Sequence, residues 1–272
     1  MGYLTTEKKK VTVKTFVEMK RDGNKIAMLT AYDYTTARLI DEEGVDSILV
    51  GDSASNVMLG NDSTLPITLD EMIVYARGVA RGCQRALVVC DMPFGTYQVS
   101  PEEGVRNAVR LIRETGVDAV KLEGGEEVAP TIERIVNAGI PVVGHLGLTP
   151  QSIHKFGGYG VRARSEVEAT KLIADAQALE KAGCFAVVLE KIPASVAQQV
   201  TDLLSVPTIG IGAGSHCDGQ VLVYADAMGL TQGFEPKFLR EFAAMGEELR
   251  RGVRAYCEAV KGDEFPNESE SY

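Results

Sequence analysis

The chain is poor in positive charge. Its 272 residues include 28 Lys and Arg against 38 Asp and Glu, which gives a formal net charge of −10 and a pI near 5.0. Proteins that bind a phosphate backbone or an anionic membrane need clustered basic side chains. The charge balance therefore argues against nucleic acid and against membranes as partners.

Two other features are missing. No apolar run approaches the length of a membrane span, and the five cysteines form no Cys-x-x-Cys pair. Cys90 lies inside an apolar run and Cys184 begins one, so both are expected to be buried thiols. Free, buried thiols are typical of a reduced compartment, and we expect the protein to be cytoplasmic.

The chain also lacks an internal linker or a break in composition. We therefore expect one barrel domain over residues 1–262, because domain boundaries usually fall in polar, flexible segments. The remaining residues, 263–272, are acidic and polar, and this composition predicts a disordered tail.

One pattern occurs five times along the chain: a glycine, a short apolar run, and then an acid or an imidazole. The five copies begin at Gly44, Gly82, Gly116, Gly139 and Gly183. The glycine suits the left-handed position that ends a helix, and runs rich in Val, Ile and Leu suit strands buried on both faces. Parallel strands that each end in a reactive group place these groups at one rim, as in the active centre of a (βα)8 barrel.

The sequence therefore predicts an α/β fold of the (βα)8, or TIM-barrel, class, with a short amino-terminal helix over 8–22 and a long carboxyl-terminal helix over 236–260. Capping patterns at Thr68 and Ser100 predict two of the helices between them. Apolar residues recur every three or four positions in the last helix, and this face is expected to pack on the barrel or against another subunit. The expected strands are residues 26–31, 47–51, 86–90, 119–122, 141–144, 185–189 and 207–212, with 221–224 or 227–230 as the eighth.

Three carboxylates stand at the ends of neighbouring expected strands. Asp52, Asp91 and Glu123 end strands two, three and four, and adjacent strands lie about 5 Å apart. Like charges this close repel each other unless a cation lies among them, and oxygen ligands favour Mg²⁺ or a similar hard ion. The alternative is that one or two of these acids form salt bridges or cap helices.

Three more candidates lie on strands four to six. Lys121 is two residues before Glu123, so both side chains should point into the barrel. Lys121 would bind a substrate carboxylate, balance the acids or form a Schiff base. His145 ends strand five, either near the substrate or as a hydrogen-bonded core residue. Glu190 ends strand six, either as the base that removes a proton beside a polarised carbonyl or as a salt-bridge partner of Lys191 or His145.

Two long loops follow expected strands, at residues 53–68 and 146–165. Loops at the carboxyl ends of barrel strands are where substrate specificity resides. A glycine-rich stretch at 209–214 follows strand seven, where many barrels bind phosphate, although the glycines alone show only a close approach of the backbone.

Several long stretches resemble motifs of the ketopantoate hydroxymethyltransferase family, and the resemblance covers nearly the whole chain. The stretches are Thr-Ala-Tyr-Asp at 30–33, Val-Gly-Asp-Ser at 50–53, Asp-Ser-Thr-Leu-Pro at 62–66, Asp-Met-Pro-Phe at 91–94, Val-Lys-Leu-Glu-Gly-Gly at 120–125, Gly-His-Leu-Gly-Leu-Thr-Pro-Gln-Ser at 144–152, Phe-Gly-Gly-Tyr at 156–159, Ile-Gly-Ile-Gly-Ala-Gly at 209–214 and Asp-Gly-Gln at 218–220.

The resemblance implies an enzyme that transfers a hydroxymethyl group from 5,10-methylenetetrahydrofolate to 3-methyl-2-oxobutanoate through a metal-stabilised enolate. The products would be 2-dehydropantoate and tetrahydrofolate, on the route to pantothenate and coenzyme A. It also implies a divalent metal, usually Mg²⁺, and a homodecamer of two pentameric rings. Carried over by motif, it implies a metal site at Asp52, Asp91 and Glu123, substrate contacts from Asp52, Ser53, Asp91, Lys121 and His145, and a proton acceptor at Glu190.

The chain departs from the family pattern beside these residues. The family commonly continues Gly-Asp-Ser with Leu-Gly-Met, whereas Ala54, Ser55 and Asn56 stand here, and residues 57, 58 and 61 also differ. The catalytic groups are present, so we expect the same reaction with an altered pocket wall or an altered loop.

Two other interpretations stay open. A metal-dependent carbon–carbon lyase of the isocitrate lyase and phosphoenolpyruvate mutase kind would share the barrel, the metal acids and the enolate. The chain has no stretch like the Lys-Lys-Cys-Gly-His catalytic loop of those lyases, and a need for methylenetetrahydrofolate would distinguish the two. A non-catalytic barrel, in which the acids only balance charge, predicts no binding of divalent metal.

Overall fold

Eight parallel strands close into a barrel in the computed structural model, which describes residues 9–272. Each strand pairs with the next in sequence, and β8 pairs with β1. The predicted fold class is therefore confirmed. The strands are β1 (Ile26–Thr30), β2 (Ser47–Val50), β3 (Leu87–Asp91), β4 (Ala119–Glu123), β5 (Val142–Gly147), β6 (Ala186–Glu190), β7 (Thr208–Ile211) and β8 (Gly219–Leu222).

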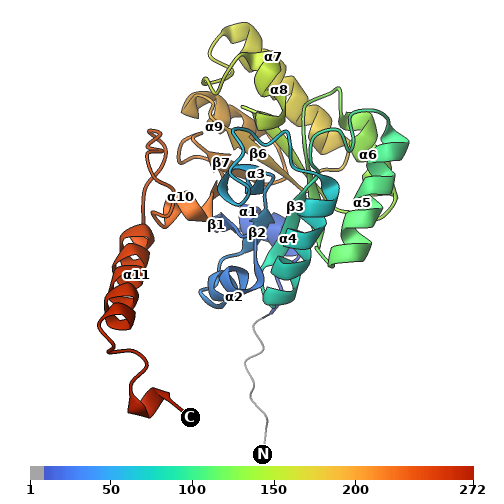
Figure 1. Ribbon diagram of the computed structural model, residues 1–272. Helices are drawn as coiled ribbons and strands as arrows, with labels where there is room; N and C mark the ends of the chain where they lie inside the picture. Colours follow the sequence, from blue (N-terminus) through green and yellow to red (C-terminus); the bar gives the residue numbers. More distant parts are fainter. Residues whose placement is uncertain (1–8) are drawn as a thin grey trace, which may run out of the picture. The chain divides into compact units, whose positions relative to one another are not determined.

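Helices cover the outside of this barrel (Figure 1). The longer ones are α2 (Tyr34–Glu42), α4 (Leu69–Gly82), α5 (Pro101–Thr115), α6 (Ala129–Asn137), α8 (Glu166–Lys181) and α9 (Ala194–Leu203). Helix α4 packs on β2 and β3, α5 on β4, α8 on β5 and β6, and α9 on β7. Short helices lie in the loops after β2 and β5, namely α3 (Ala54–Val57), η1 (Pro150–Ser152) and α7 (Ile153–Phe156).

Two helix starts follow the predicted capping patterns. The Thr68 hydroxyl accepts a hydrogen bond from the backbone N–H of Glu71, whose carboxylate accepts one from the N–H of Thr68. Ser100 accepts from the N–H of Glu103, with Pro101 as the first residue of α5. These contacts satisfy amide groups that the first turn of a helix leaves unpaired.

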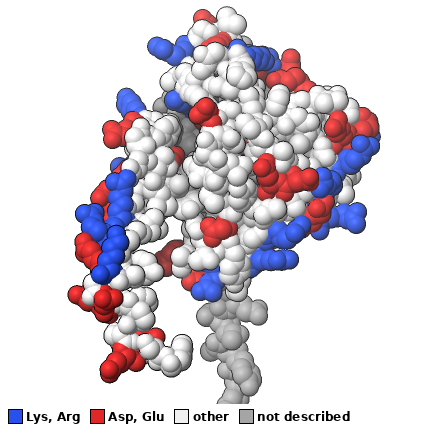
Figure 2. Space-filling model, in the orientation of Figure 1, with Lys and Arg blue, Asp and Glu red and all other residues white. Residues whose placement is uncertain are grey.

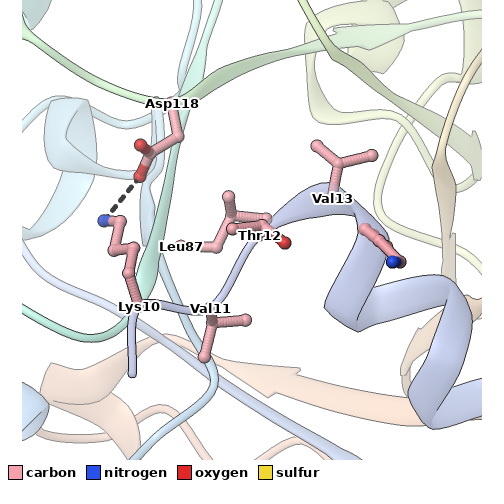
Figure 3. A pocket seen from close by; sticks show the side chains of 7 residues that line it. Lys10, Val11, Thr12, Val13, Leu87 and Asp118 are labelled. Carbon is pink, nitrogen blue, oxygen red and sulfur yellow. Dashed lines mark ion pairs between the residues drawn. The ribbon is translucent and has the colours of Figure 1, made fainter. Parts of the chain in front are cut away.

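Apolar side chains fill the amino-terminal half of the barrel. Phe16, from α1 (Val13–Arg21), packs edge-on against Phe185 with ring centroids 5.7 Å apart, and both belong to the interior core. A cavity of about 300 Å³ lies at this end, beside Leu87 at the start of β3 (Figure 3). An ion pair between Lys10 and Asp118, with the Nζ–Oδ2 distance 2.8 Å, lines it. This cavity is at the opposite end of the strands from the acids at their carboxyl ends.

Two of the predicted strands differ from the structure by more than one residue at an end. The eighth strand spans Gly219–Leu222, earlier than either predicted segment. A Cβ at Gly219 would lie 2.6 Å from both Ile209 Cδ1 and the Ile26 carbonyl oxygen, so glycine permits this strand to fit between β1 and β7. Strand β5 continues to Gly147, so His145 lies within this strand instead of ending it.

The cysteines are all free thiols, and Cys90 and Cys184 are buried as predicted. Burial raises the pKa of Cys184 to about 12.

A second compact unit, Tyr224–Tyr272, follows the barrel, whose unit ends at Val223. It contains α10 (Tyr224–Ala227), α11 (Met245–Lys261) and the single turn η2 (Glu268–Glu270). Helix α11 begins nine residues later than the predicted start at 236. The reason is that the backbone N–H groups of Phe242 and Met245 donate to the carbonyl oxygens of residues 227 and 228, which ties this segment to the turn after α10.

One face of α11 is apolar and exposed. Leu249, Val253, Tyr256 and Val260 are spaced by four, three and four residues and are between 41% and 62% exposed. Figure 2 shows charged side chains gathered along another side of this helix. Within residues 9–272, no helix combines the length and the apolar character of a membrane span.

Candidate active site

The register of β3, β4 and β5 pairs the polar residues at their carboxyl ends. Asp91 lies opposite Lys121, and Glu123 lies opposite His145. Lys121 Nζ is 3.0 Å from Asp91 Oδ1, and both side chains are almost fully buried. The predicted inward direction of Lys121 is therefore correct, and its charge is balanced inside the barrel.

The His145 ring connects acids on two different strands. Its Nδ1 atom is 3.3 Å from Glu123 Oε1, and its Nε2 atom is 3.3 Å from Glu190 Oε2 on β6. Lys121 Nζ is 3.1 Å from the same Nδ1. Of the two salt-bridge partners foreseen for Glu190, the structure therefore selects His145. The Glu190 side chain is 18% exposed, against 4% for His145, so Glu190 is the member that a substrate can reach.

Asp52 and Ser53 approach this group from the loop after β2. The backbone N–H of Asp52 donates to Asp91 Oδ2 over 2.9 Å. Ser53 Oγ is 2.7 Å from the hydroxyl of Tyr32, which is buried after β1. A Cβ at Gly51 would lie 2.7 Å from Ser53 Oγ and 3.7 Å from Asp91 Oδ2, so the glycine leaves room for both polar groups.

Sequence reasoning missed two members of the site. Gln151, from η1, donates its side-chain N–H to Asp52 Oδ2 over 2.9 Å and its backbone N–H to Glu123 Oε2 over 2.9 Å. The Tyr97 hydroxyl donates to Gln151 Oε1 over 2.7 Å and accepts from the N–H of Glu123 over 3.0 Å. Gln151 belongs to one of the stretches that resemble the family motifs, which was the only signal for it. Tyr97 lies outside all of them.

Burial and mutual repulsion perturb the carboxyl groups. Burial, followed by the charges of Asp91 and Glu123, raises the pKa of Asp52 well above its usual value. Burial also raises the pKa of Asp91, although Lys121 opposes the shift. The pKa of Glu123 is lowered, because the raising effect of burial is outweighed by the contacts with His145 and Lys121.

The two basic groups respond in the opposite sense. Burial lowers the pKa of Lys121, but the charges of the three neighbouring carboxylates outweigh it and raise the pKa above its usual value. Burial and the Lys121 charge lower the pKa of His145, yet its contacts with Glu123 and Glu190 raise it from 6.5 to about 9. The site thus brings four carboxyl groups together with two bases, and the mutual repulsion of the carboxylates contributes to the raised pKa of Asp52.

The donor atoms suit a hard divalent cation. Among the described residues, the buried atoms Asp91 Oδ1, Glu123 Oε1 and His145 Nε2 form no hydrogen bond of ordinary geometry, and each lies 3.0–3.3 Å from the ion-pair partner named above. Carboxylate oxygens are the ligands that Mg²⁺ and similar hard cations prefer. Within residues 9–272, however, no three His, Cys, Asp or Glu side chains are grouped closely enough to hold an ion. The carboxylate oxygens are of the type that binds a hard cation, whereas the described side chains do not form a three-ligand cluster.

The loop after β5 is attached to the residue that follows Glu190. Lys191 Nζ donates to the Tyr159 carbonyl oxygen over 2.6 Å, and the Lys191 carbonyl accepts from the N–H of Arg162 over 2.9 Å. Lys191 adopts a positive φ of 50°, a strained conformation for this residue type. Burial raises the pKa of Tyr159, and the charges of Asp52, Asp62 and Glu190 raise it further.

The residues that depart from the family pattern bond to one another. Ser55 Oγ donates to the Ser63 carbonyl over 2.7 Å and accepts from the Asn61 side chain over 3.1 Å. Asn56 Nδ2 donates to the Asn61 carbonyl over 2.8 Å. The changed positions therefore close the loop beside Asp52 with their own hydrogen bonds.

A closed parallel barrel with acids and bases at the carboxyl ends of its strands defines an enzyme of the (βα)8-barrel class. The family model for ketopantoate hydroxymethyltransferase matches residues 10–268. The chain belongs to the ketopantoate hydroxymethyltransferase family.

Relatives of high similarity carry the name 3-methyl-2-oxobutanoate hydroxymethyltransferase. The protein from Parabacteroides distasonis is 60% identical over 98% of this chain and 97% of its own length. Those from Flavobacterium johnsoniae and Bacteroides thetaiotaomicron are 58% and 56% identical, and they cover 97% and 100% of this chain and 97% and 99% of their own lengths.

Solved structures of low sequence identity share the fold. Phosphonopyruvate hydrolase, in a complex with oxalate and Mg²⁺, matches with a TM-score of 0.61 at 11% identity, over 95% of this chain and 92% of its own. The structure of 2,3-dimethylmalate lyase, a member of the PEP mutase/isocitrate lyase superfamily, matches with a TM-score of 0.58 at 18% identity, over 94% of this chain and 89% of its own.

Proposed function

We propose that this chain transfers a hydroxymethyl group from 5,10-methylenetetrahydrofolate to 3-methyl-2-oxobutanoate, with 2-dehydropantoate and tetrahydrofolate as products. The observation that carries the proposal is the position of the His145 ring, which contacts buried Glu123 on one side and the more exposed Glu190 on the other. A base that can be reached from the mouth thus lies next to a buried, charged cluster. This arrangement suits removal of a proton beside a carbonyl group.

Glu190 is the proposed proton acceptor. The C3–H bond of the keto acid breaks, the proton passes to the Glu190 carboxylate, and the electron pair stays on the substrate as an enolate. The enolate carbon then bonds to the methylene carbon as one of the two C–N bonds of that carbon to the folate breaks, and water displaces the other, leaving its OH on this carbon. The C3 proton and the remaining proton of the water end on the two folate nitrogens, which gives tetrahydrofolate. Keto acid, methylenetetrahydrofolate and water together balance the two products.

Lys121 and Ser53 are the proposed ligands of the keto acid, with Asp52, Asp91 and His145 around it. An ammonium group has three N–H donors, and one of those of Lys121 is directed to Asp91 Oδ1. A protonated His145 ring, which its raised pKa favours, has no lone pair for Lys121, so a further N–H is left for a substrate carboxylate. Tyr32 holds the Ser53 hydroxyl in place through the 2.7 Å contact.

Asp52, Asp91 and Glu123 are the residues that would hold a divalent cation such as Mg²⁺. When bound, this ion would supply the positive charge that acidifies the C3 proton and stabilises the enolate. The hydrogen bonds that bring these carboxylates together, from the Asp52 N–H to Asp91 and from Gln151 to Asp52 and Glu123, support this assignment.

Exchange of the C3 proton in D₂O tests the assignment of Glu190. Proton NMR of 3-methyl-2-oxobutanoate with Mg²⁺, but without folate, follows formation of the enolate alone. We expect the wild type to exchange this proton and Glu190→Gln to lose exchange and transfer together. Exposed Glu133, on α6, offers a matched control in Glu133→Gln, which should behave as wild type. Normal exchange by Glu190→Gln would remove this residue from its proposed role.

Dependence on the folate distinguishes the transferase from a lyase. The barrel is shared with 2,3-dimethylmalate lyase, so the fold alone does not separate the two activities. Product formation that needs methylenetetrahydrofolate supports the transferase, whereas cleavage of the keto acid without folate would support the lyase. Mg²⁺ titration calorimetry tests the third interpretation, a non-catalytic barrel, which predicts no binding.

We also propose that the protein is a cytoplasmic homodecamer of two pentameric rings, with a single barrel domain over residues 1–262. The exposed apolar face of α11 supports self-association, because contiguous apolar surface usually marks an interface. Light scattering after gel filtration of the wild type and of Leu249→Asp tests it. A monomeric wild type would contradict the assembly.

A further inference from the structure

Gln151 uses every hydrogen-bonding position of its side chain inside the site. Its Nε2 donates to Asp52 Oδ2 over 2.9 Å and to the Met92 carbonyl oxygen over 3.0 Å. Its Oε1 accepts from the Tyr97 hydroxyl over 2.7 Å and from Gln98 Nε2 over 3.1 Å. A side-chain amide has two donors and two lone pairs, so this residue is fully satisfied.

The partners also determine which way the amide faces. The opposite orientation would set Oε1 against the Asp52 carboxylate and the Met92 carbonyl, both of which only accept hydrogen bonds. It would also turn the amide N–H groups toward Gln98 Nε2, which is a donor. Gln151 is 6% exposed, so water does not compensate for such a mismatch.

The same residue restrains two of the three acids. The side chain holds Asp52 by Oδ2, and the backbone N–H holds Glu123 by Oε2. These bonds engage one oxygen of each carboxylate, and the other oxygen of Glu123 lies 3.3 Å from His145 Nδ1. Tyr97 supports both halves of the arrangement, since its hydroxyl contacts Gln151 Oε1 and the N–H of Glu123.

We propose that Gln151 is a positioning residue that orients the Asp52 and Glu123 carboxylates for a divalent cation, with Tyr97 holding Gln151 in turn. The proposal rests on the proposed use of these acids as cation ligands. Residues that orient the ligands of a metal typically change its affinity by about 10–100-fold when they are replaced.

Binding of Mn²⁺ to the full-length protein without substrate, followed by the electron paramagnetic resonance signal of free Mn²⁺, tests this. We expect Gln151→Met, which keeps the size of the side chain and the backbone N–H, to weaken binding by at least about tenfold. Tyr97→Phe should weaken it to a smaller extent, because the bond from Gln151 to Asp52 remains. Circular dichroism and the melting temperature report whether each variant is folded. If Gln151→Met does not fold, the Mn²⁺ affinity of Tyr97→Phe alone decides the test.

Thr201→Val provides a control for a purely structural effect. Thr201 is also 6% exposed, and its hydroxyl bonds to Thr208 at the start of β7, at the other end of the strands. We expect this variant to lose stability without a change in Mn²⁺ affinity. Affinities within twofold of the wild type for both site variants, or an equal loss in Thr201→Val, would overturn the role of Gln151. A wild type that does not bind Mn²⁺ would instead overturn the proposed cation site.

Discussion

Replacing Lys121 by Met is expected to destabilise the protein through a buried charge that loses its partner. The Lys121 and Asp91 side chains are 4% and 3% exposed, with the Nζ–Oδ1 distance 3.0 Å. Met fills most of the space of Lys, so the main change is the loss of the positive charge. Removing one member of a buried ion pair typically costs about 3–5 kcal/mol, because the other charge stays buried without compensation.

This loss predicts a large shift in melting temperature. For domains of this size, 1 kcal/mol lowers the melting temperature by roughly 2–4 °C, so Lys121→Met should melt about 6–20 °C below the wild type. Thermal unfolding followed by circular dichroism at pH 7.5 with EDTA measures the shift. The exposed pair of Lys14 and Glu18 offers a matched control, because the Lys14 side chain is 84% exposed and such pairs contribute about 0–1 kcal/mol.

Acidification separates the effect of charge from an effect of packing. Burial already raises the pKa of Asp91, and without the opposing charge of Lys121 it should rise further. A carboxyl group with a raised pKa in the folded state is less destabilising as the pH falls toward that pKa. Lys121→Met should therefore recover part of its stability between pH 7.5 and 5.5. A melting temperature within about 2 °C of the wild type at pH 7.5, or a loss that does not change with pH, would refute this reasoning.

Three further predictions concern His145, Gly147 and the loop after β2. The pKa of His145 is raised to about 9, so its contribution to stability is complete below pH 6.5 and is lost as the pH rises through 9. Denaturant titrations in EDTA should therefore show that the free energy of unfolding of the wild type falls by about 3 kcal/mol more than that of His145→Gln over this range. Gly147 has φ of 92°, and a Cβ there would lie 2.2 Å from the Glu190 carbonyl oxygen. Gly147→Ala should therefore lower the free energy of unfolding by more than about 1 kcal/mol and slow C3 proton exchange. Unchanged values would show that the backbone adjusts freely. Asn56→Ala removes the bond to the Asn61 carbonyl and should cost about 1 kcal/mol while raising the KM for the keto acid; an unchanged KM would separate this loop from substrate selection.

The local pattern of residues was sufficient to locate most strands of the barrel. A fully buried parallel strand needs a short apolar run, and a glycine with positive φ ends a helix without strain. Gly116, with φ of 81°, ends α5 in this way, and the strand that follows carries Lys121 and Glu123. The positions of these strands and the acids at their ends were therefore visible without a structure. The eighth strand was misplaced because Gly219 and Gln220 carry no apolar signal, and only their pairing with β1 and β7 identifies them.

The reactive groups at the barrel rim could be identified from local pattern, because alternation along a strand fixes which side chains point inward. Which of these groups touch one another depends on how the strands and loops are arranged in space. Three contacts join different strands or loops. They are the ion pair of Lys121 with Asp91, the contacts of His145 with Glu123 and Glu190, and the hydrogen bond from Gln151 to Asp52. Such contacts depend on the stagger between neighbouring strands and on the path of the loops, and no local property of the chain encodes either.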